Sequence, residues 1–205
     1  MQNGKIPVGA ATCRPWATED GRPPAGFRFI RVRFIKKDVT TVRIAGLIED
    51  SIVDGPGLRY VVFVQGCELS CEGCHNPEAW SKVGGNEMPT DEIIAQMLGN
   101  PLTDGLTLSG GEPFLQVEEC IKLSSAAREN GLNVWVYSGF TFEELFARSQ
   151  SEQAIRELME LADVLIDGPF ILAERTLSLR WRGSRNQRVL DMHKSMETGK
   201  AIELA

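Results

Sequence analysis

The sequence lacks the hydrophobic segments of a membrane or exported protein. No run approaches the roughly 20 apolar residues that cross a bilayer, and the clearest run is the short Val61–Val64. Near the N-terminus, the apolar stretch Ile6–Ala11 is shorter than the roughly 7–15 residues of a signal peptide, and a proline interrupts it. We therefore expect a cytoplasmic protein with no membrane partner.

Cysteine is scarce and odd in number, with five residues in a chain of 205. A disulfide framework needs pairs and an oxidising compartment, so we expect reduced thiols that act as ligands or nucleophiles. Internal repeats and low-complexity tracts are absent as well. With 42% hydrophobic and 24% charged residues, the chain has the composition of a globular protein that buries a core.

The net charge of −6 is distributed unevenly along the chain. Residues 1–43 hold nine basic and three acidic side chains, a balance of +6, so the remainder carries −12. An acidic body repels a phosphate backbone, and we therefore expect no direct nucleic-acid binding, while the basic N-terminal arm leaves a local contact open.

Residues 1–41 form a basic N-terminal extension that contains proline and glycine and has little periodicity. This composition is typical of a poorly ordered segment. Two interpretations stay open: a misassigned start with Val42 as the true initiator, or a basic arm that binds a partner. A regular pattern begins at Val42, and we predict one main domain over residues 42–205.

From Val42 onward, short β-branched or aromatic runs alternate with helical patterns. Strands are predicted at residues 44–48, 60–64, 106–108, 133–137 and 164–166, the second of them buried on both faces. One helix is predicted from a Thr90 cap to about residue 98, and another at 117–130. Two more are predicted after the capping box 141–144 and from a Ser151 cap to about residue 161.

Strands that alternate with helices predict an α/β fold with a mostly parallel sheet. In such sheets, ligands bind at the carboxyl ends of the strands. The loops that begin at Gly66, Ser109, Ser138 and Asp167 are therefore the expected site.

Three of the five cysteines fall within eight residues, directly after the buried strand. Cys67, Cys71 and Cys74 have C-x3-C-x2-C spacing. Three thiolates on one tight loop can each hold one iron of a [4Fe–4S] cluster, which leaves the fourth iron open to a substrate or cofactor. Cluster ligation is the interpretation that uses all three residues.

Three other kinds of site fit the residues of this loop less well. Cys71–His75 matches the C-x-x-C-H attachment of a c-type haem, but that chemistry needs an exported protein and leaves Cys67 unexplained. A zinc site with His75 is disfavoured because zinc ligands usually come in two separated pairs. A redox pair of Cys71 and Cys74 again ignores Cys67. Cys120 lies in a predicted helix, where a small buried thiol is expected.

The cysteine spacing, together with Ser109–Pro113 (SGGEP) after a later strand, resembles the radical S-adenosylmethionine superfamily. In that superfamily the glycine-rich motif holds the methionine part of the cofactor. Taken alone, SGGEP reads as a turn that leads from a strand into a helix.

Two further segments narrow the resemblance. Asp54–Arg59 (DGPGLR) is similar to the entry motif of activases of glycyl radical enzymes. Asp167–Phe170 and Leu179–Gln187 resemble the closing segment of the anaerobic ribonucleoside-triphosphate reductase activating protein family. The similarity covers about residues 42–192, and it departs from that family at His75, where a tyrosine is frequent.

The resemblance implies a fold and a reaction. The fold is a partial, open (β/α) barrel of radical SAM type. The reaction is reductive cleavage of S-adenosyl-L-methionine at a single [4Fe–4S] cluster into methionine and a 5′-deoxyadenosyl radical, which generates a glycyl radical on the anaerobic (class III) reductase. No catalytic side chain is implied beyond the cluster and cofactor.

The same resemblance assigns site residues. The implied cluster ligands are Cys67, Cys71 and Cys74, and the implied S-adenosylmethionine contacts are Gly73, Cys74, His75, Gly110, Gly111 and Glu112. The implied partners are the glycyl radical subunit of the reductase and a low-potential electron donor such as flavodoxin or ferredoxin.

Alternatives remain for function and for one surface. The chain is either the reductase activase, an activase of another glycyl radical enzyme such as pyruvate formate-lyase, or a non-catalytic iron–sulfur electron carrier. A carrier has no use for a methionine-binding turn, which argues against the third. The basic residues Arg180, Arg182, Arg185 and Arg188 fit either a docking surface for an acidic partner or a solvated face.

Overall fold

The computed structural model of the chain describes residues 40–204. The predicted extension therefore lies outside the described residues, apart from its last two. Within residues 40–204 there are seven strands and five α-helices. The strands are β1 (Thr41–Ser51), β2 (Arg59–Val64), β3 (Asn86–Pro89), β4 (Gly105–Gly110), β5 (Asn133–Tyr137), β6 (Val164–Asp167) and β7 (Arg188–Asp191). The helices are α1 (Thr90–Gly99), α2 (Val117–Glu129), α3 (Phe142–Arg148), α4 (Gln153–Leu161) and α5 (Met192–Thr198).

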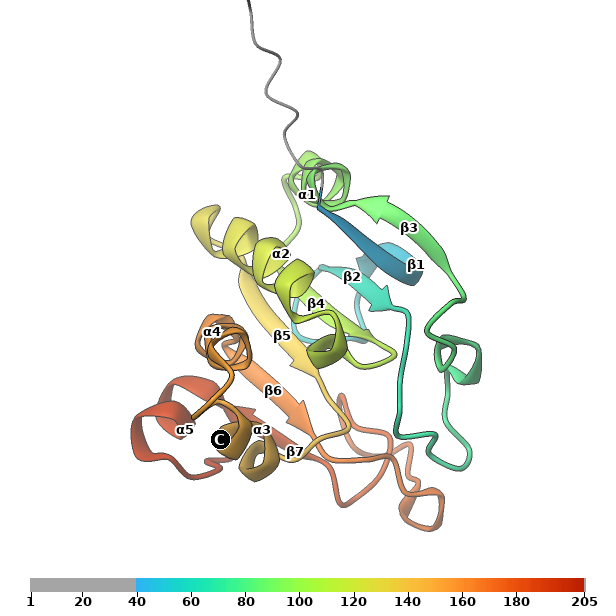
Figure 1. Ribbon diagram of the computed structural model, residues 1–205, viewed down its shortest axis with the longest axis vertical. Helices are drawn as coiled ribbons and strands as arrows, with labels where there is room; N and C mark the ends of the chain where they lie inside the picture. Colours follow the sequence, from blue (N-terminus) through green and yellow to red (C-terminus); the bar gives the residue numbers. More distant parts are fainter. Residues whose placement is uncertain (1–39, 205) are drawn as a thin grey trace, which may run out of the picture. The chain divides into compact units, whose positions relative to one another are not determined.

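All seven strands form one open sheet in the order β3-β1-β2-β4-β5-β6-β7. The four central strands, β2, β4, β5 and β6, run parallel, whereas β1, β3 and β7 pair antiparallel at the two sides. The α/β prediction is confirmed. The predicted mostly parallel arrangement holds for the four central strands, whereas the sheet as a whole is mixed (Figure 1).

Successive side chains of each strand point to opposite faces of the sheet. Tyr60, Val62 and Val64 point to the face that the helices cover, where they join the main core. Residues from all five helices pack there, including Ile93, Leu123, Phe142, Leu158 and Met192. Each such buried apolar side chain contributes about 1.5–3 kcal/mol to the free energy of unfolding. Strand β2 is buried on both faces, as predicted, so its carboxyl end lies in the interior of the sheet.

Three elements escaped the sequence analysis, and two predicted caps are wrong. Strands β3 and β7 are four residues long, and α5 has seven, too short to show periodicity. Helix α4 begins after Glu152 rather than Ser151. Thr90 is the first residue inside α1, and its hydroxyl donates to the Thr40 carbonyl instead of capping.

The capping box at the start of α3 is confirmed. The Thr141 hydroxyl accepts from the Glu144 N–H, and the Glu144 carboxylate accepts from the Thr141 N–H. None of the helices in residues 40–204 has the length and apolar character to cross a membrane.

The parallel arrangement determines where the site lies. The loops that follow β2, β4, β5 and β6 leave the sheet at the same end, because parallel strands share their carboxyl ends (Figure 1).

Candidate functional site

The loop after β2 carries the three clustered cysteines and is closed at its base by backbone hydrogen bonds. The Gly66 N–H donates to the Ala79 carbonyl at 2.8 Å, and the Cys67 N–H donates to the Trp80 carbonyl at 3.1 Å. The side-chain amide of Gln65 donates to two further carbonyls of this loop, at 2.9 and 2.7 Å. These bonds fix the backbone at Cys67 relative to the end of β2.

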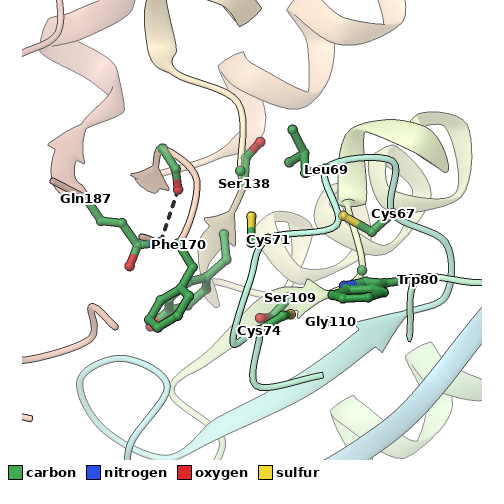
Figure 2. A pocket seen from close by; sticks show the side chains of 14 residues that line it. Cys67, Leu69, Cys71, Cys74, Trp80, Ser109, Gly110, Ser138, Phe170 and Gln187 are labelled. Atoms are coloured by element: carbon green, nitrogen blue, oxygen red, sulfur yellow. Dashed lines mark hydrogen bonds between the residues drawn. The ribbon is translucent and has the colours of Figure 1, made fainter. Parts of the chain in front are cut away.

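Cys67, Cys71 and Cys74 line one pocket at the carboxyl end of the sheet (Figure 2). The last residues of β4 and β5 and the turns after β4, β5 and β6 complete its wall, through Gly110, Gly111, Tyr137, Ser138, Gly168 and Phe170. The pocket therefore draws on all four loops that the parallel sheet brings together. It adjoins a second cavity of about 460 Å³, which shares Cys74, Ser109 and Phe170 with it.

The thiols fit a cluster better than a single ion. All three are free of disulfide bonds. Within residues 40–204, no three His, Cys, Asp or Glu side chains converge on one metal-ion position. Convergence is not required for a cubane, because each thiolate binds a different iron. The fourth described cysteine, Cys120, is fully buried in α2 and does not line this pocket. Burial raises the pKa of its thiol.

The thiols of Cys67 and Cys74 have different surroundings. Burial raises the pKa of the Cys67 thiol, so the free thiol resists ionisation until a metal replaces its proton. The sulfur of Cys74 accepts a hydrogen bond from the Asn76 N–H at 3.4 Å.

Two adjacent glycines, one ending β4 and one just after it, allow the backbone to approach the cysteine loop closely. Gly110 has φ +99°, and a Cβ there would lie 2.6 Å from the backbone of Phe63. At Gly111, a Cβ would lie 2.3 Å from the Gly66 carbonyl oxygen. The Gly111 N–H donates to the Val64 carbonyl at 2.7 Å. Only glycines permit the turn to pack against the end of β2 in this way.

Glu112 lies beneath the pocket rather than on its wall. Its side chain is fully buried, and its carboxylate accepts hydrogen bonds from Phe114 N–H, Ser138 Oγ and Gly139 N–H at 3.1, 3.0 and 2.9 Å. Burial raises its pKa to about 7, against three donors that favour the ionised form. The side chain thus ties the turn after β4 to the loop after β5.

His75 and Gly73 sit at the outer part of the cysteine loop. His75 is exposed, lines the second cavity, and lies with its ring centroid 5.3 Å from that of Phe170. Gly73 has φ +72°, and a Cβ there would come within 2.8 Å of Leu172 Cδ1. Of the predicted cofactor contacts, Cys74, Gly110 and Gly111 line the cysteine pocket, whereas Gly73 and Glu112 line neither cavity.

Comparison with known proteins identifies the kind of site. A family model described as a 4Fe-4S single cluster domain matches residues 53–190. The anaerobic ribonucleoside-triphosphate reductase-activating protein of Haemophilus influenzae is 36% identical over 146 residues, covering 66% of this chain and 89% of that protein. The protein of the same name from Enterobacteria phage T4 is 37% identical over 145 residues, covering 67% and 86%.

The chain belongs to this family of activating proteins. A pyruvate formate-lyase-activating enzyme from Clostridium pasteurianum is also similar, at 38% identity over 112 residues. That match covers 50% of this chain and 47% of the Clostridium enzyme. The family resemblance that the cysteine, SGGEP and closing motifs indicate is confirmed.

Several residues that line the pocket of this family member were not predicted individually as cofactor contacts, although some of them belong to segments that the sequence indicates. Trp80, Tyr137, Ser138, Phe170 and Gln187 contribute to its wall. The loops that begin at Ser138 and Asp167 were predicted as site loops, and Tyr137 could have been found as the last residue of its strand. Gln187 ends the closing motif Leu179–Gln187, but a glutamine 20 residues past β6 has no fixed position before the fold is known, so its place in the pocket wall was not predictable.

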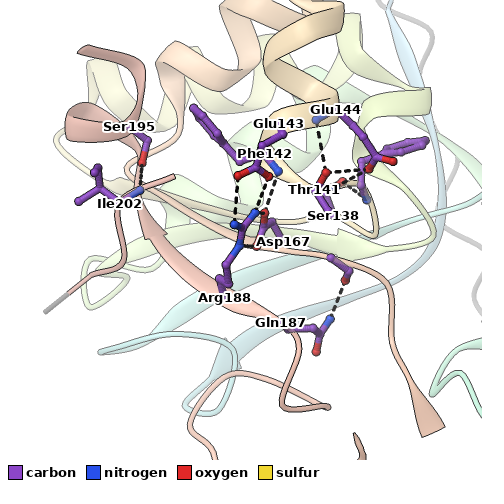
Figure 3. Close-up of polar contacts among 12 residues, drawn as sticks. Ser138, Thr141, Phe142, Glu143, Glu144, Asp167, Gln187, Arg188, Ser195 and Ile202 are labelled. Atoms are coloured by element: carbon purple, nitrogen blue, oxygen red, sulfur yellow. Dashed lines mark hydrogen bonds and ion pairs between the residues drawn. The ribbon is translucent and has the colours of Figure 1, made fainter. Parts of the chain in front are cut away.

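Two of the predicted charged residues turn inward in this family member. Arg59 is fully buried at the opposite end of β2 from the cysteines, where its Nε donates to Thr107 Oγ1 at 3.0 Å. Arg188 pairs with Asp167 and Glu143 (Figure 3). Arg188 therefore does not belong to a docking surface with the other arginines near it.

Proposed function

We propose that this chain activates an anaerobic ribonucleoside-triphosphate reductase by generating a glycyl radical on it. One observation carries the proposal: three free thiols and the SGGEP turn share a pocket, in a chain that matches 89% of the length of a reductase-activating protein. The chain is accordingly a radical SAM activating oxidoreductase with a [4Fe–4S] cluster.

Cys67, Cys71 and Cys74 would hold the cluster, one thiolate to each of three irons. Gly73, Cys74, His75, Gly110, Gly111 and Glu112 would surround S-adenosylmethionine. When bound and supplied with one electron by a donor, these groups would provide reductive cleavage of S-adenosylmethionine to methionine and a 5′-deoxyadenosyl radical.

The chain's own residues orient these groups and exclude water. The rigid turn at Gly110 and Gly111 presents backbone rather than side chains to the pocket, which leaves room for a cofactor against the cysteine loop. Leu69, Trp80 and Phe170 form apolar parts of the wall. Exclusion of water protects a reactive radical from side reactions.

The fold supports the same proposal. We take the open sheet, with its four parallel central strands, as the partial (β/α) barrel of radical SAM type. The activase domain is proposed to span residues 42–205, and a low-potential donor such as flavodoxin or ferredoxin is proposed to supply the electron.

Pyruvate formate-lyase is the second candidate partner. The Clostridium pasteurianum enzyme shares 38% identity, but this chain spans about half of its length. The two reductase-activating relatives are covered over 86–89% of theirs, which favours the reductase.

The test is an anaerobic assay after reconstitution with iron and sulfide. The reduced protein receives S-adenosylmethionine and either the reductase or pyruvate formate-lyase, and 5′-deoxyadenosine and the glycyl doublet in the electron paramagnetic resonance spectrum are recorded. We expect both signals with the reductase, and their loss in Cys71→Ala. Cys120→Ala is the matched control, and it should retain iron and both signals. Deoxyadenosine without the reductase doublet would refute the proposed partner, and no deoxyadenosine would favour an electron carrier.

A further inference from the structure

A groove lies beside the candidate site, between the turn after β1 and the segment that joins β6 to β7. Residues 52–57 form one side and residues 177–181 the other, around a volume of about 800 Å³. Ile52, Val53 and Leu177 expose 76%, 71% and 89% of their surface there. Large apolar side chains exposed together on facing segments mark a contact surface.

The segment between β6 and β7 is also basic. Residues 172–187 carry four arginines and one glutamate, whereas the chain after residue 43 carries −12 overall. Arg175, Arg180 and Arg185 are exposed, and no carboxylate in residues 40–204 pairs with them.

Arginines elsewhere in the described part of the chain behave differently: five of the six pair with a carboxylate, and the sixth, Arg59, is buried and donates to uncharged groups. Arg43, Arg128, Arg148, Arg156 and Arg188 each pair with a carboxylate of the same chain. Among the described residues, the exposed arginines without a carboxylate partner are thus concentrated on one segment, which is drawn in orange to red after β6 in Figure 1.

The groove is continuous with the candidate site. Val53 and Trp181 line both the groove and the second cavity. That cavity is in turn lined by Cys74 and Ser109, which belong to the cysteine pocket. A chain segment held in the groove therefore has a direct path to the place where the radical would form.

We propose that residues 172–187 and the adjoining groove dock an acidic surface of the reductase, next to the segment that carries its target glycine. The inference rests on the proposed function. Arg175, Arg180 and Arg185 attract and orient the partner, while Leu177 makes an apolar contact at the groove. Exposed charges of this kind affect the association rate and its salt dependence more than they affect folding.

The experiment compares two triple variants of the reconstituted full chain. In the first, Arg175, Arg180 and Arg185 are each changed to Gln. In the matched control, Arg156, Lys194 and Lys200, which lie on α4, on α5 and just after α5, are changed to Gln. Affinity for the purified reductase is measured at low and high salt, and 5′-deoxyadenosine formation is measured without the reductase.

We expect the first variant to bind the reductase about tenfold more weakly at low salt, with a difference that shrinks at high salt because screening removes the attraction. The control should stay within about twofold of the unmodified protein. Leu177→Asp should weaken binding as well, since it places a like charge against an acidic surface at a site that is open to solvent. Deoxyadenosine formation without the reductase should be equal in all four proteins.

Equal affinity of the first variant and the unmodified protein at low salt would overturn the docking surface. An equal loss in the two triple variants would overturn it too, because the effect would then come from net charge. If the unmodified protein neither binds the reductase nor produces its glycyl doublet, the proposed function fails instead.

Discussion

The carboxylate of Glu112 accepts a hydrogen bond from the backbone N–H of Gly139, 2.9 Å away. Glu112 follows β4 and Gly139 follows β5, so one buried side chain joins the turns after two neighbouring parallel strands. The Ser138 hydroxyl donates to the same carboxylate. The relationship explains why a glutamate in the SGGEP segment is buried under the pocket.

Stability should depend on the protonation of Glu112. Its folded-state pKa of about 7 lies above the ordinary value of 4.5, so the folded state binds this proton more tightly than the unfolded state. The resulting stabilisation is complete below pH 4.5 and is lost as pH rises through 7. For the metal-free protein, the free energy of unfolding should fall by about 3 kcal/mol from pH 5 to pH 8. Urea unfolding at the two pH values measures it. In Glu112→Gln this difference should disappear, and an unchanged difference would contradict the assignment.

Gly111→Ala should damage both stability and the site. The new Cβ would lie 2.3 Å from the Gly66 carbonyl oxygen, so the cysteine loop or the turn must move. We expect a loss of about 2 kcal/mol in the free energy of unfolding and loss of 5′-deoxyadenosine formation. Gly99→Ala is the control, because no atom lies within 4 Å of its added Cβ. At the end of α1 that change should be neutral or stabilising by up to about 1 kcal/mol. Equal stability of both variants would refute the close approach.

Arg59→Lys should destabilise the protein although it keeps the positive charge. The guanidinium donates to Thr107 Oγ1 at 3.0 Å, to the Leu106 carbonyl at 2.5 Å, and to Asn133 Oδ1. An ammonium cannot reach these acceptors with the same planar geometry. We expect a loss of about 2 kcal/mol in chemical denaturation, because buried acceptors lose their donors. Arg156→Lys, on the exposed side of α4, should change stability by less than about 0.5 kcal/mol. A comparable effect of both changes would argue against the buried network.

Arg188→Gln and Glu143→Gln should differ in cost although they remove partners in one ion-pair network. The Asp167 carboxylate is 1% exposed and accepts from both Arg188 and the Phe142 N–H. Removal of Arg188 leaves that carboxylate buried without its cation, and a loss of about 2–3 kcal/mol is expected. Glu143 is 60% exposed, so its removal should cost less than about 1 kcal/mol. Thermal unfolding of the two variants tests the order, and the reverse order would refute it.

The cysteine loop and the site loops were predictable because they depend on local signals. Spacing within eight residues and the turn residues at the ends of buried strands indicate them without knowledge of the fold. The burial of the charged groups of Arg59 and Glu112, and the contact of Arg188 with a buried carboxylate, were not predictable in this way. Charged residues are usually exposed, and each of these turns inward because of donors or acceptors supplied by segments at least 20 residues away in the chain.

The short elements failed for a different physical reason. Strand β7 and helix α5 are stabilised by contacts with β6, α4 and the C-terminal residues rather than by their own pattern. A segment of four to seven residues has too few positions to display a hydrophobic period. Helix α3 and strand β6 are as short, but they were predicted from other signals, a capping box and a run of apolar residues.

The hydrogen bonds from Gly111 N–H to the Val64 carbonyl and from Glu112 N–H to the Gly66 carbonyl continue the β2–β4 ladder past the last paired residues of the strands. These backbone hydrogen bonds hold the start of the cysteine loop against the turn that contains Gly111, as strand pairing holds β2 against β4. Because the sheet joins the two segments, the distance between them is set by strand pairing rather than by the cofactor that the pocket would hold.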